Sequence, residues 1–310
     1  MNAPLIRISS SPVEERHMST LDACKPIAVG GVSGSGTRVV ARILMELGIY
    51  MGGHLNGPRD NLWFALLVVK PRWLPDHQEE IIKGLQIFRD TMLGRLNRTP
   101  DTVMFILRAF LRFRSPRDFL LFPPPYYAGA LASLLRAKHA PPASSIGWGW
   151  KLPETYLFLP YVKAVFPKVK YIHVIRHGLD MAYSRNQHQF WAWGAYFGIR
   201  PQRSVKLFPK ALLQFWLRAN EWAIAQARSL LGGDFLLLNF DELCRHPDEM
   251  VRELARFIGI EAETSRIERA CQLIRPPRTQ GRYRSRDLSI FDPCDLDAVR
   301  RFGFEIKGVG

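Results

Sequence analysis

The stretch PIAVGGVSGSGTRVVARILMEL, residues 26–47, decides the fold of this chain. It begins with an apolar run at 27–32, short enough to be one buried strand, and continues with the glycine-containing turn SGSGT at 33–37. From Thr37 the apolar residues recur at helical spacing, and Gly48 stands where a left-handed helix stop is expected. A strand, a glycine turn and a helix in this order predict a phosphate cradle, because backbone N–H groups and the positive end of the helix converge on one anion.

The turn matches neither of two common phosphate-binding patterns. Gly31 and Gly36 have the spacing of the nucleoside triphosphate loop GxxxxGK[ST], but Thr37 and Arg38 follow where lysine and a hydroxyl residue belong. The dinucleotide pattern GxGxxG also fails, because Val39 occupies the place of its third glycine. The pattern therefore disfavours an ordinary ATPase and an ordinary dehydrogenase. A glycine turn that serves only close packing remains an alternative.

The composition indicates a basic protein with a large core. The chain has 310 residues, of which 47% are hydrophobic, and this suits one large α/β domain or a core with an insertion. The formal net charge of +15 predicts an anionic ligand, acceptor or surface. No zinc-finger spacing, basic heptad region or RNP-like aromatic strand is present, so nucleic acid is not the expected partner.

Cysteine usage and the N-terminal segment favour a cytoplasmic protein. Cys24, Cys244, Cys271 and Cys294 are far apart and form no CxxC pair, as expected for free thiols in a reducing compartment. The first twenty residues lack the apolar segment of a signal peptide, and no later run reaches the ~18 apolar residues of a membrane span. We expect residues 1–24 to be loosely ordered.

A glycine-rich loop, YMGGHLNGPRDNLW at 50–63, follows the first predicted helix and carries His54 and Asp60. Long loops directly after a phosphate cradle often carry function. From about 60 to 143 the sequence is mostly helical with proline breaks, and we expect a helical insertion there. Its arginines between 108 and 117 either face solvent or flank an acceptor cleft.

Two further strands are expected to end in cations. In SIGWGWKLP, residues 145–153, Lys151 ends a short strand, and a proline followed by Glu154 opens a helix. In VKYIHVIR, residues 169–176, Arg176 ends the strand, and Ser184 lies one or two turns into the helix that follows. Open parallel sheets place ligands at these carboxyl ends, where a guanidinium and a hydroxyl can hold a second phosphate.

At this point the chain resembles the sulfotransferases that use 3′-phosphoadenosine 5′-phosphosulfate (PAPS), in particular the bacterial and carbohydrate-directed members. GVSGSGTR resembles their 5′-phosphosulfate loop, IRHGLDMAYS their 3′-phosphate motif, and WKLP the segment that supplies a lysine beside the transferred group. FLLLNFDELCRHPDEMVRELARFIGI, residues 235–260, resembles a further strand, turn and helix of the family. The four motifs stand in family order, over residues 26–304 with gaps at 60–140 and 190–208.

Two departures from the family pattern concern the phosphate-binding motifs. Many cytosolic members carry a lysine inside the first loop, whereas Arg38 is the cation of this loop, so Lys151 would carry more of the charge neutralisation. His177 and Gly178 replace the more usual Asp-Pro or Asn-Pro after the arginine. The second departure changes the expected shape of the local turn but does not change the assignment of IRHGLDMAYS as the 3′-phosphate motif.

The resemblance implies a three-layer α/β/α fold of the P-loop NTPase type, with a mostly parallel central sheet plus the helical insertion, in one domain over 25–310. It implies transfer of a sulfuryl group from PAPS, without a metal, to a hydroxyl or amine of a glycan, glycolipid or small molecule, leaving 3′-phosphoadenosine 5′-phosphate (PAP). The implied donor-binding residues are Ser33, Gly34, Ser35, Gly36, Thr37, Arg38, Arg176, Ser184, Gly281, Arg282 and Tyr283.

The implied chemistry places Lys151 near the bridging oxygen of the donor, while a general base deprotonates the acceptor. His54 and Asp60 are the first candidates for the base, and Glu154 is the third. A nucleotide-dependent small-molecule kinase and a non-catalytic nucleotide-binding relative remain alternative functions. The aromatic stretch 190–197 serves packing, or else contacts the acceptor or a membrane surface from its periphery.

Overall fold

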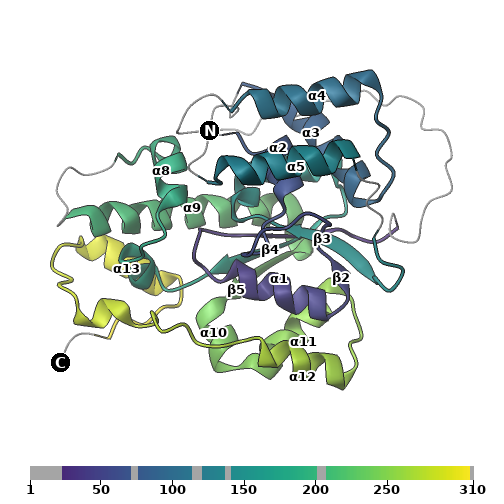
Figure 1. Ribbon diagram of the computed structural model, residues 1–310. Helices are drawn as coiled ribbons and strands as arrows, with labels where there is room; N and C mark the ends of the chain where they lie inside the picture. The colour runs from purple at the N-terminus through teal and green to yellow at the C-terminus, as the bar shows by residue number, and fades with distance from the viewer. Residues whose placement is uncertain (1–22, 71–75, 114–120, 137–140, 201–206, 308–310) are drawn as a thin grey trace.

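The computed structural model describes residues 23–70, 76–113, 121–136, 141–200 and 207–307. Nearly all of the N-terminal segment expected to be loosely ordered, residues 1–22, lies outside these ranges. Within them the centre of the molecule is a five-stranded parallel sheet in the order β2-β3-β1-β4-β5 (Figure 1). Its strands are β1 (Ile27–Gly30), β2 (Ile49–Tyr50), β3 (Gly147–Lys151), β4 (Lys170–Ile175) and β5 (Phe235–Asn239).

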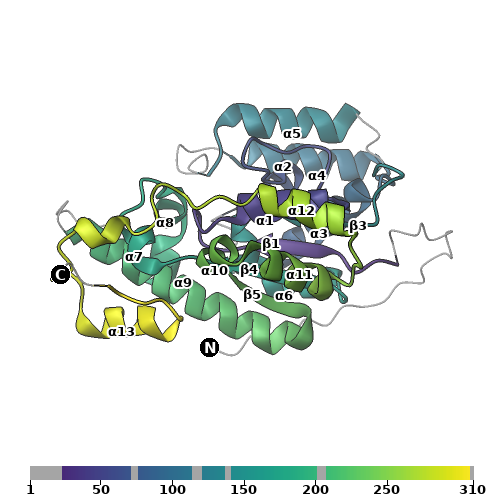
Figure 2. The same ribbon diagram turned by 90° about the horizontal axis from the view of Figure 1, so that it is seen from below.

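Helices cover both faces of the sheet, which confirms the expected three-layer fold (Figures 1 and 2). One face carries α1 (Thr37–Glu46), α10 (Phe240–Arg245), α11 (Pro247–Ile258) and α12 (Thr264–Gln272). The other carries α6 (Leu159–Val165), α9 (Phe208–Leu231) and a helical group between β2 and β3, with α13 (Pro293–Arg301) packed beside α9. That group comprises α2 (Leu62–Leu67), α3 (Gln78–Met92), α4 (Pro100–Leu111) and α5 (Pro124–Arg136).

The two faces of β1 enter two separate hydrophobic cores. Ile27 and Val29 pack with the buried face of α1 in one cluster, whereas Ala28 belongs to the larger cluster on the opposite face. Side chains on a strand alternate between faces, so a strand covered on both sides reads as a continuous apolar run. This explains why the apolar run at 27–32 shows no alternation of polar and apolar residues.

Helix ends follow the expected sequence signals. Gly48, after α1, has φ 94°, and Gly259 ends α11 in the left-handed conformation with φ 80°. Helix α9 ends at Leu231 and is followed by Gly232, with φ 52°. Short elements complete the chain: η2 (Pro153–Phe158), α7 (Gly178–Ala182), α8 (His188–Trp193), η3 (Gly194–Phe197), η5 (Gly232–Asp234) and η6 (Arg282–Ser285).

The expectation that Ser184 lies inside a helix is wrong. Helix α7 ends at Ala182, and the backbone N–H of Ser184 closes a turn onto the carbonyl of Met181 at 2.9 Å. The Ser184 hydroxyl then accepts a hydrogen bond from the backbone N–H of Asn186 at 3.1 Å. Such a local side-chain bond competes with the helical pattern, and this is the physical reason for the early end.

The sheet topology brings three strand ends together. From β1 the chain moves to one side through β2 and β3, then to the other side through β4 and β5. In register, Val29 of β1 lies beside Lys151 of β3 and Ile172 of β4. The residues after these strands therefore meet at one edge of the sheet, at the switch point where open α/β sheets form a ligand crevice.

Candidate functional site

A cavity of about 530 Å³ lies at this edge of the sheet. It is lined by the turn after β1, by Lys151 at the end of β3, by Glu154 just after it, and by Arg176 after β4. A fourth wall comes from Leu121 and the residues that follow it at the start of α5. The structure thus brings the turn at 33–37 into one cavity with two segments that follow it by more than a hundred residues in sequence.

The glycine turn is shaped by backbone conformations that favour glycine. Gly34 and Gly36 have φ of 94° and 105°, and the N–H of Ser35 bonds back to the carbonyl of Val32 at 3.1 Å. A Cβ on Gly36 would lie 2.2 Å from the ring of Phe240, so the first residue of α10 packs directly against the turn. These constraints leave the backbone of 33–37 little room for any other conformation.

The turn presents both backbone and side chains to the ligand space. Ser33, Gly34, Gly36, Thr37 and Arg38 line the cavity, with Thr37 buried and Arg38 exposed. The hydroxyl of Ser35 is buried and has no hydrogen-bond partner among the described residues. Helix α1 begins here with no side-chain cap and no acidic residue in its first turn. Its first N–H groups therefore remain available for an anion.

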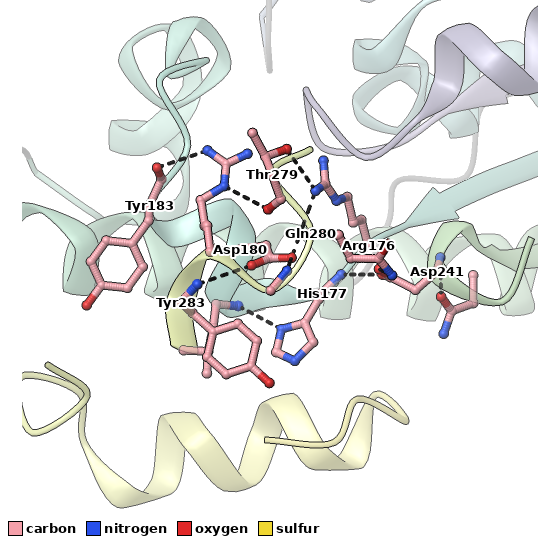
Figure 3. A network of polar contacts seen from close by, with 12 residues as sticks. Arg176, His177, Asp180, Tyr183, Asp241, Thr279, Gln280 and Tyr283 are labelled. Carbon is pink, nitrogen blue, oxygen red and sulfur yellow. Dashed lines mark hydrogen bonds and ion pairs between the residues drawn. The ribbon is translucent and has the colours of Figure 1, made fainter. Parts of the chain in front are cut away.

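Arg176 lines the opposite part of the cavity and is buried (Figure 3). Its Nη2 donates to the hydroxyl of Thr279 at 3.2 Å and lies 3.9 Å from Oδ2 of Asp180. Its Nε is buried and has no partner within the part of the chain that the structure describes. A buried guanidinium N–H without an acceptor costs free energy unless a ligand supplies one, so Arg176 is a good candidate for an anion.

Asp180 and Asp241 fasten the late segment 279–283 beside Arg176 (Figure 3). Asp180 accepts the backbone N–H of Gly281 at 2.7 Å and that of Tyr283 at 3.4 Å. Asp241 accepts the side chain of Gln280 at 3.2 Å and the backbone N–H of His177 at 2.9 Å. These contacts hold in place the late segment to which the family resemblance assigned donor-binding residues.

The late-loop residues and Ser184 lie outside the described lining of the cavity. Arg282 donates to the carbonyls of Tyr183 and Thr279, each at 3.1 Å, and burial lowers its pKa, with Arg176 acting in the same direction. Tyr283 is buried and stacks on the ring of His177, with centroids 4.5 Å apart. Ser184 bonds to Asn186, which does line the cavity.

Lys151 is 2% exposed in its side chain and forms an ion pair with Oδ1 of Asp60. Oδ2 of Asp60 accepts from Nδ2 of Asn56 at 2.8 Å, so both oxygens of this carboxylate have partners. Burial lowers the pKa of Lys151, and the charge of Asp60 opposes that shift. The pair holds a desolvated ammonium group at the end of β3, facing the ligand space.

The backbone around Asp60 is fixed from several sides. Arg59 has φ 67°, which a residue with a side chain seldom adopts, and the N–H of Asp60 donates to the side chain of Asn56 at 2.8 Å. Next in sequence, Asn61 caps α2 by accepting from Phe64 at 3.1 Å, and its N–H donates to the carbonyl of Lys151 at 2.8 Å. Asp60 is therefore placed by the fold.

Glu154 is a buried carboxyl group with one oxygen left open. Its Oε1 accepts from Nε2 of Gln189 at 3.2 Å, while its Oε2 has no partner among residues in the described ranges. The pKa of Glu154 is raised to about 7, mainly by burial of the carboxyl group and secondly by the negative charge of Asp60. Gln189 in turn accepts the backbone N–H of Ser33 at 2.9 Å, which connects Glu154 to the glycine turn.

His54 lies beside the cavity but is not part of its described lining. Its carbonyl accepts from the backbone N–H of Leu62 at 3.1 Å. Its Nε2 lies 3.2 Å from the position a Cβ would take on Gly129, so the ring packs near α5. Of the three candidates for a base, Asp60 and Glu154 line the cavity.

One wall of the cavity is apolar. The start of α5 and the residues before it contribute Leu121, Phe122, Pro123 and Tyr126, and Pro58 adds to this wall from the loop after β2. The cations of the lining, Arg38, Lys151 and Arg176, come from the strand ends and the start of α1. The cavity therefore has a cationic part for an anionic ligand and an apolar part for a second molecule.

Several residues at the site were not found from the sequence. Gln189 stands just before the aromatic stretch 190–197, yet it is 1% exposed and bridges two parts of the site. Its position directly before the aromatic stretch 190–197, after Asn186 and Gln187, gave no signal that singled it out. Phe240 and Pro277 likewise carried no signal, because only the fold brings them to the cavity.

Metal binding and membrane crossing can be judged for the residues that the structure describes. No group of three or more histidine, cysteine or acidic side chains in those ranges is placed to hold a metal ion. No helix among them combines the length and the apolar character needed to cross a membrane. The four cysteines form no disulfide.

A parallel sheet with a glycine turn and a helix at its switch point defines a P-loop-like, nucleotide-binding α/β fold. The model of the Sulfotransferase family matches residues 26–264, so the chain belongs to that family and the resemblance seen in its motifs is confirmed. A relative described as an uncharacterized protein of Aquifex aeolicus (strain VF5) is 27% identical over 122 residues, or 38% of this chain. The chain spans about 15% of the length of that relative.

Solved structures with similar folds include bacterial sulfotransferases. STF1 from Mycobacterium tuberculosis H37Rv is 18% identical, with a TM-score of 0.42, over 81% of this chain and 72% of that one. STF9 from Mycobacterium avium is 16% identical, with a TM-score of 0.44, over 94% and 80%. The sulfotransferase domain of the Synechococcus PCC 7002 olefin synthase is 13% identical, with a TM-score of 0.47, over 94% and 100%.

Proposed function

We propose that this chain transfers the sulfuryl group of PAPS to a hydroxyl group of an acceptor that has an apolar body. The observation that supports this most directly is the single cavity lined by the glycine turn, Lys151 and Arg176. Two separated anion-binding parts with a buried lysine beside one of them suit a nucleotide with phosphates at two positions.

The unsatisfied polar groups of the site fit such a donor. The buried Nε of Arg176 lacks an acceptor among the described residues and suits the 3′-phosphate, while Ser33, Thr37 and the backbone of Gly34 and Gly36 line the cavity and suit the 5′-phosphosulfate. When bound, PAPS supplies the sulfuryl group. The protein's part, as in phosphoryl transfer, is to position the reactants and to stabilise charge on the transferred and leaving oxygens.

Lys151 is assigned the stabilisation of the leaving oxygen. Its ammonium group is removed from water, and a charge in such a place acts more strongly on a neighbouring anion than an exposed charge does. Asp60 keeps the group oriented before the donor binds. Arg38, at the exposed side of the turn, adds a second positive charge.

The apolar wall narrows the acceptor class. Leu121, Phe122, Pro123 and Tyr126 offer contact area for an aromatic or aliphatic body and no charge for an anionic glycan. Of the acceptors expected from the family, a hydroxylated small molecule or the apolar part of a glycolipid fits this wall better. The acceptor hydroxyl then lies between this wall and Lys151.

A binding and transfer experiment tests the proposal. Calorimetric titration should show tight binding of PAP and weak binding of ATP with Mg²⁺; preference for ATP would contradict the proposal and favour a kinase. Transfer of ³⁵S from labelled PAPS should then be measured into lipid, glycan and small-molecule fractions of a cell extract. We expect label in the lipid or small-molecule fraction, and no transfer to any fraction would contradict enzyme function.

Lys151→Met provides the matched variant, because methionine keeps the length of the side chain and removes its charge. We expect PAP binding within a few-fold of wild type and transfer lower by ~100- to 1000-fold. Lys168→Met, an exposed change before β4 at the opposite edge of the sheet, is the control and should behave as wild type. Unchanged transfer in Lys151→Met would refute the role given to Lys151.

A further inference from the structure

We infer that Glu154 is the general base of this site. We also infer that Gln189 is the positioning residue that holds the carboxyl group of Glu154 at a fixed place relative to the glycine turn. The inference rests on the proposed function and adds to it the group that accepts the acceptor's proton. It also selects one of the three candidates that the sequence left open.

The first support is the open oxygen of Glu154. The residue is 2% exposed and lines the cavity, and its Oε2 is buried with no hydrogen-bond partner among the described residues. Buried polar atoms in native proteins are nearly always paired, so an unpaired one in a ligand cavity points to a ligand or a proton. A carboxyl group that belongs to the cavity lining and has one oxygen without a partner among the described residues is placed to serve as a base.

The second support is the state of the other two candidates. Asp60 has both oxygens engaged, one by Lys151 and one by Asn56, and taking up a proton would break the ion pair that orients Lys151. The ring of His54 packs against α5, outside the described lining of the cavity. Glu154 therefore combines access to the cavity with an oxygen that has no other role.

The third support is electrostatic. Two buried carboxyl groups, Asp60 and Glu154, face one lysine, and Lys151 bonds to Asp60. Burial and Asp60 raise the pKa of Glu154 to about 7, while its hydrogen bonds and Lys151 act to lower it. Tyr156 on η2 adds no charge, because burial raises its pKa well above the usual value. A base with a pKa near the working pH is the most efficient proton acceptor.

The proposed step balances as follows. The acceptor oxygen forms a bond to sulfur while the bond from sulfur to the 5′-phosphate oxygen breaks, and the phosphate keeps the electron pair. The acceptor proton moves to Oε2 of Glu154, which becomes a neutral carboxylic acid and later releases the proton to solvent through the cavity. Burial favours this neutral form, so the protein stabilises the product of the proton transfer.

Gln189 connects the base to the donor site. One amide side chain accepts from Ser33 in the turn and donates to Glu154, at 2.9 and 3.2 Å. Because Gln189 is itself buried on α8, neither contact can move without the other. The position of the base is therefore tied to the backbone that holds the donor.

Glu154→Gln is the first test, since it keeps the shape and can still accept from Gln189. We expect PAP affinity within a few-fold of wild type and transfer lower by ~100-fold or more. Glu154→Asp should recover part of the rate. Glu249→Gln, an exposed change on α11, is the matched control and should match wild type. Transfer by Glu154→Gln within twofold of wild type would overturn the inference.

The pH dependence gives a readout that a structural role would not move. In wild type, kcat/KM should fall as the pH drops through about 7, because protonated Glu154 cannot accept a proton. The corresponding limb of kcat should lie at higher pH, since a bound anion favours the protonated carboxyl group. Both limbs should be absent from the residual activity of Glu154→Gln; a limb that persists unchanged would overturn the inference.

A binding measurement separates failure of this inference from failure of the proposed function. PAP binding to wild type near pH 7 should take up more protons than binding to Glu154→Gln, measured by calorimetry in buffers of different ionisation enthalpy. Equal uptake by both proteins overturns the role of Glu154, whatever the acceptor. Absence of PAP binding to wild type overturns the proposed function and, with it, this inference.

Discussion

Two buried polar clusters lie on β4 and β3, the strands on either side of β1, and differ in one respect. On β4 and α9, His173 bonds to the hydroxyl of Tyr171 at 2.7 Å and to Asn220 at 2.9 Å. Asn220 also donates to the carbonyl of Trp216 at 2.7 Å. Burial lowers the pKa of His173 to about 4, so the ring stays neutral and every named group has a partner.

The second cluster, at the end of β3, is equally buried but incomplete. Lys151 and Asp60 satisfy each other, whereas Oε2 of Glu154 and, across the cavity, Nε of Arg176 have no partner among the described residues. The comparison teaches that burial and a shifted pKa do not by themselves mark a functional site. A titratable group is a candidate for chemistry when its hydrogen-bonding capacity is left open toward a cavity.

The largest expected effect comes from breaking the complete cluster. His173→Leu leaves the hydroxyl of Tyr171 and the amide of Asn220 buried without partners, and should lower the free energy of unfolding by about 3 kcal/mol or more. Denaturant unfolding measures this. The exposed change His246→Leu is the control and should cost far less. A shifted pH profile of transfer in His173→Leu would show that the two clusters are not independent.

Glu154→Gln should act on stability in the opposite direction, with an effect that begins above about pH 4 and is complete above about pH 7. The pKa of Glu154 is raised in the folded protein, so folding loses stability as the pH rises from the unfolded pKa, near 4, to about 7. Removing the charge should recover up to about 3 kcal/mol at pH 8 and nothing at pH 4, by the conversion of ~1.4 kcal/mol per pKa unit. Thermal unfolding at the two pH values measures it. An equal shift at both would contradict the raised pKa.

Arg176→Lys tests the other open group of the site. Lysine keeps the charge but lacks the fork of N–H groups, so it cannot hold both Thr279 and an anion in the same way. We expect PAP binding weaker by ~10- to 100-fold, as measured by calorimetry, with little change in unfolding. Arg245→Lys, on the exposed end of α10, should bind as wild type does. Equal affinities in all three proteins would remove Arg176 from the donor site.

The smallest effect is expected at Gln189. Gln189→Leu removes a hydrogen bond to the turn and one to Glu154, so PAP binding should weaken by about 1 kcal/mol, or roughly fivefold. Since Gln189 lowers the pKa of Glu154, its loss should move the acidic limb of kcat/KM to higher pH. Weaker binding with an unmoved limb would show that Gln189 supports the turn alone.

The parts of the fold that depend on local order could be predicted from the sequence. The strand, turn and helix at 26–47 are contiguous, so their pattern carries the information. Lys151 and Arg176 could be assigned to strand ends because each follows a short apolar run, and parallel pairing then brings those ends together. Membership of the sulfotransferase family followed from the order of such local motifs.

The parts that depend on contacts between distant residues could not be predicted. The pair of Lys151 and Asp60 joins positions 91 residues apart, and nothing in either segment indicates that the lysine is already neutralised. The burial of Glu154 and its contact with Gln189 likewise require the positions of β3 and α8. Three candidates for the base could therefore be named from the sequence, but the burial and the hydrogen-bond partners that distinguish them could not be predicted.

The contact between Arg176 and Thr279 also has a consequence for biosynthesis. These residues are 103 positions apart, and Thr279 belongs to the segment that Asp180 and Asp241 hold in place. A growing chain that has just completed β4 therefore has its arginine but not the partner that orients it. On the proposed function, nucleotide binding is therefore expected to require that the late loop has left the ribosome.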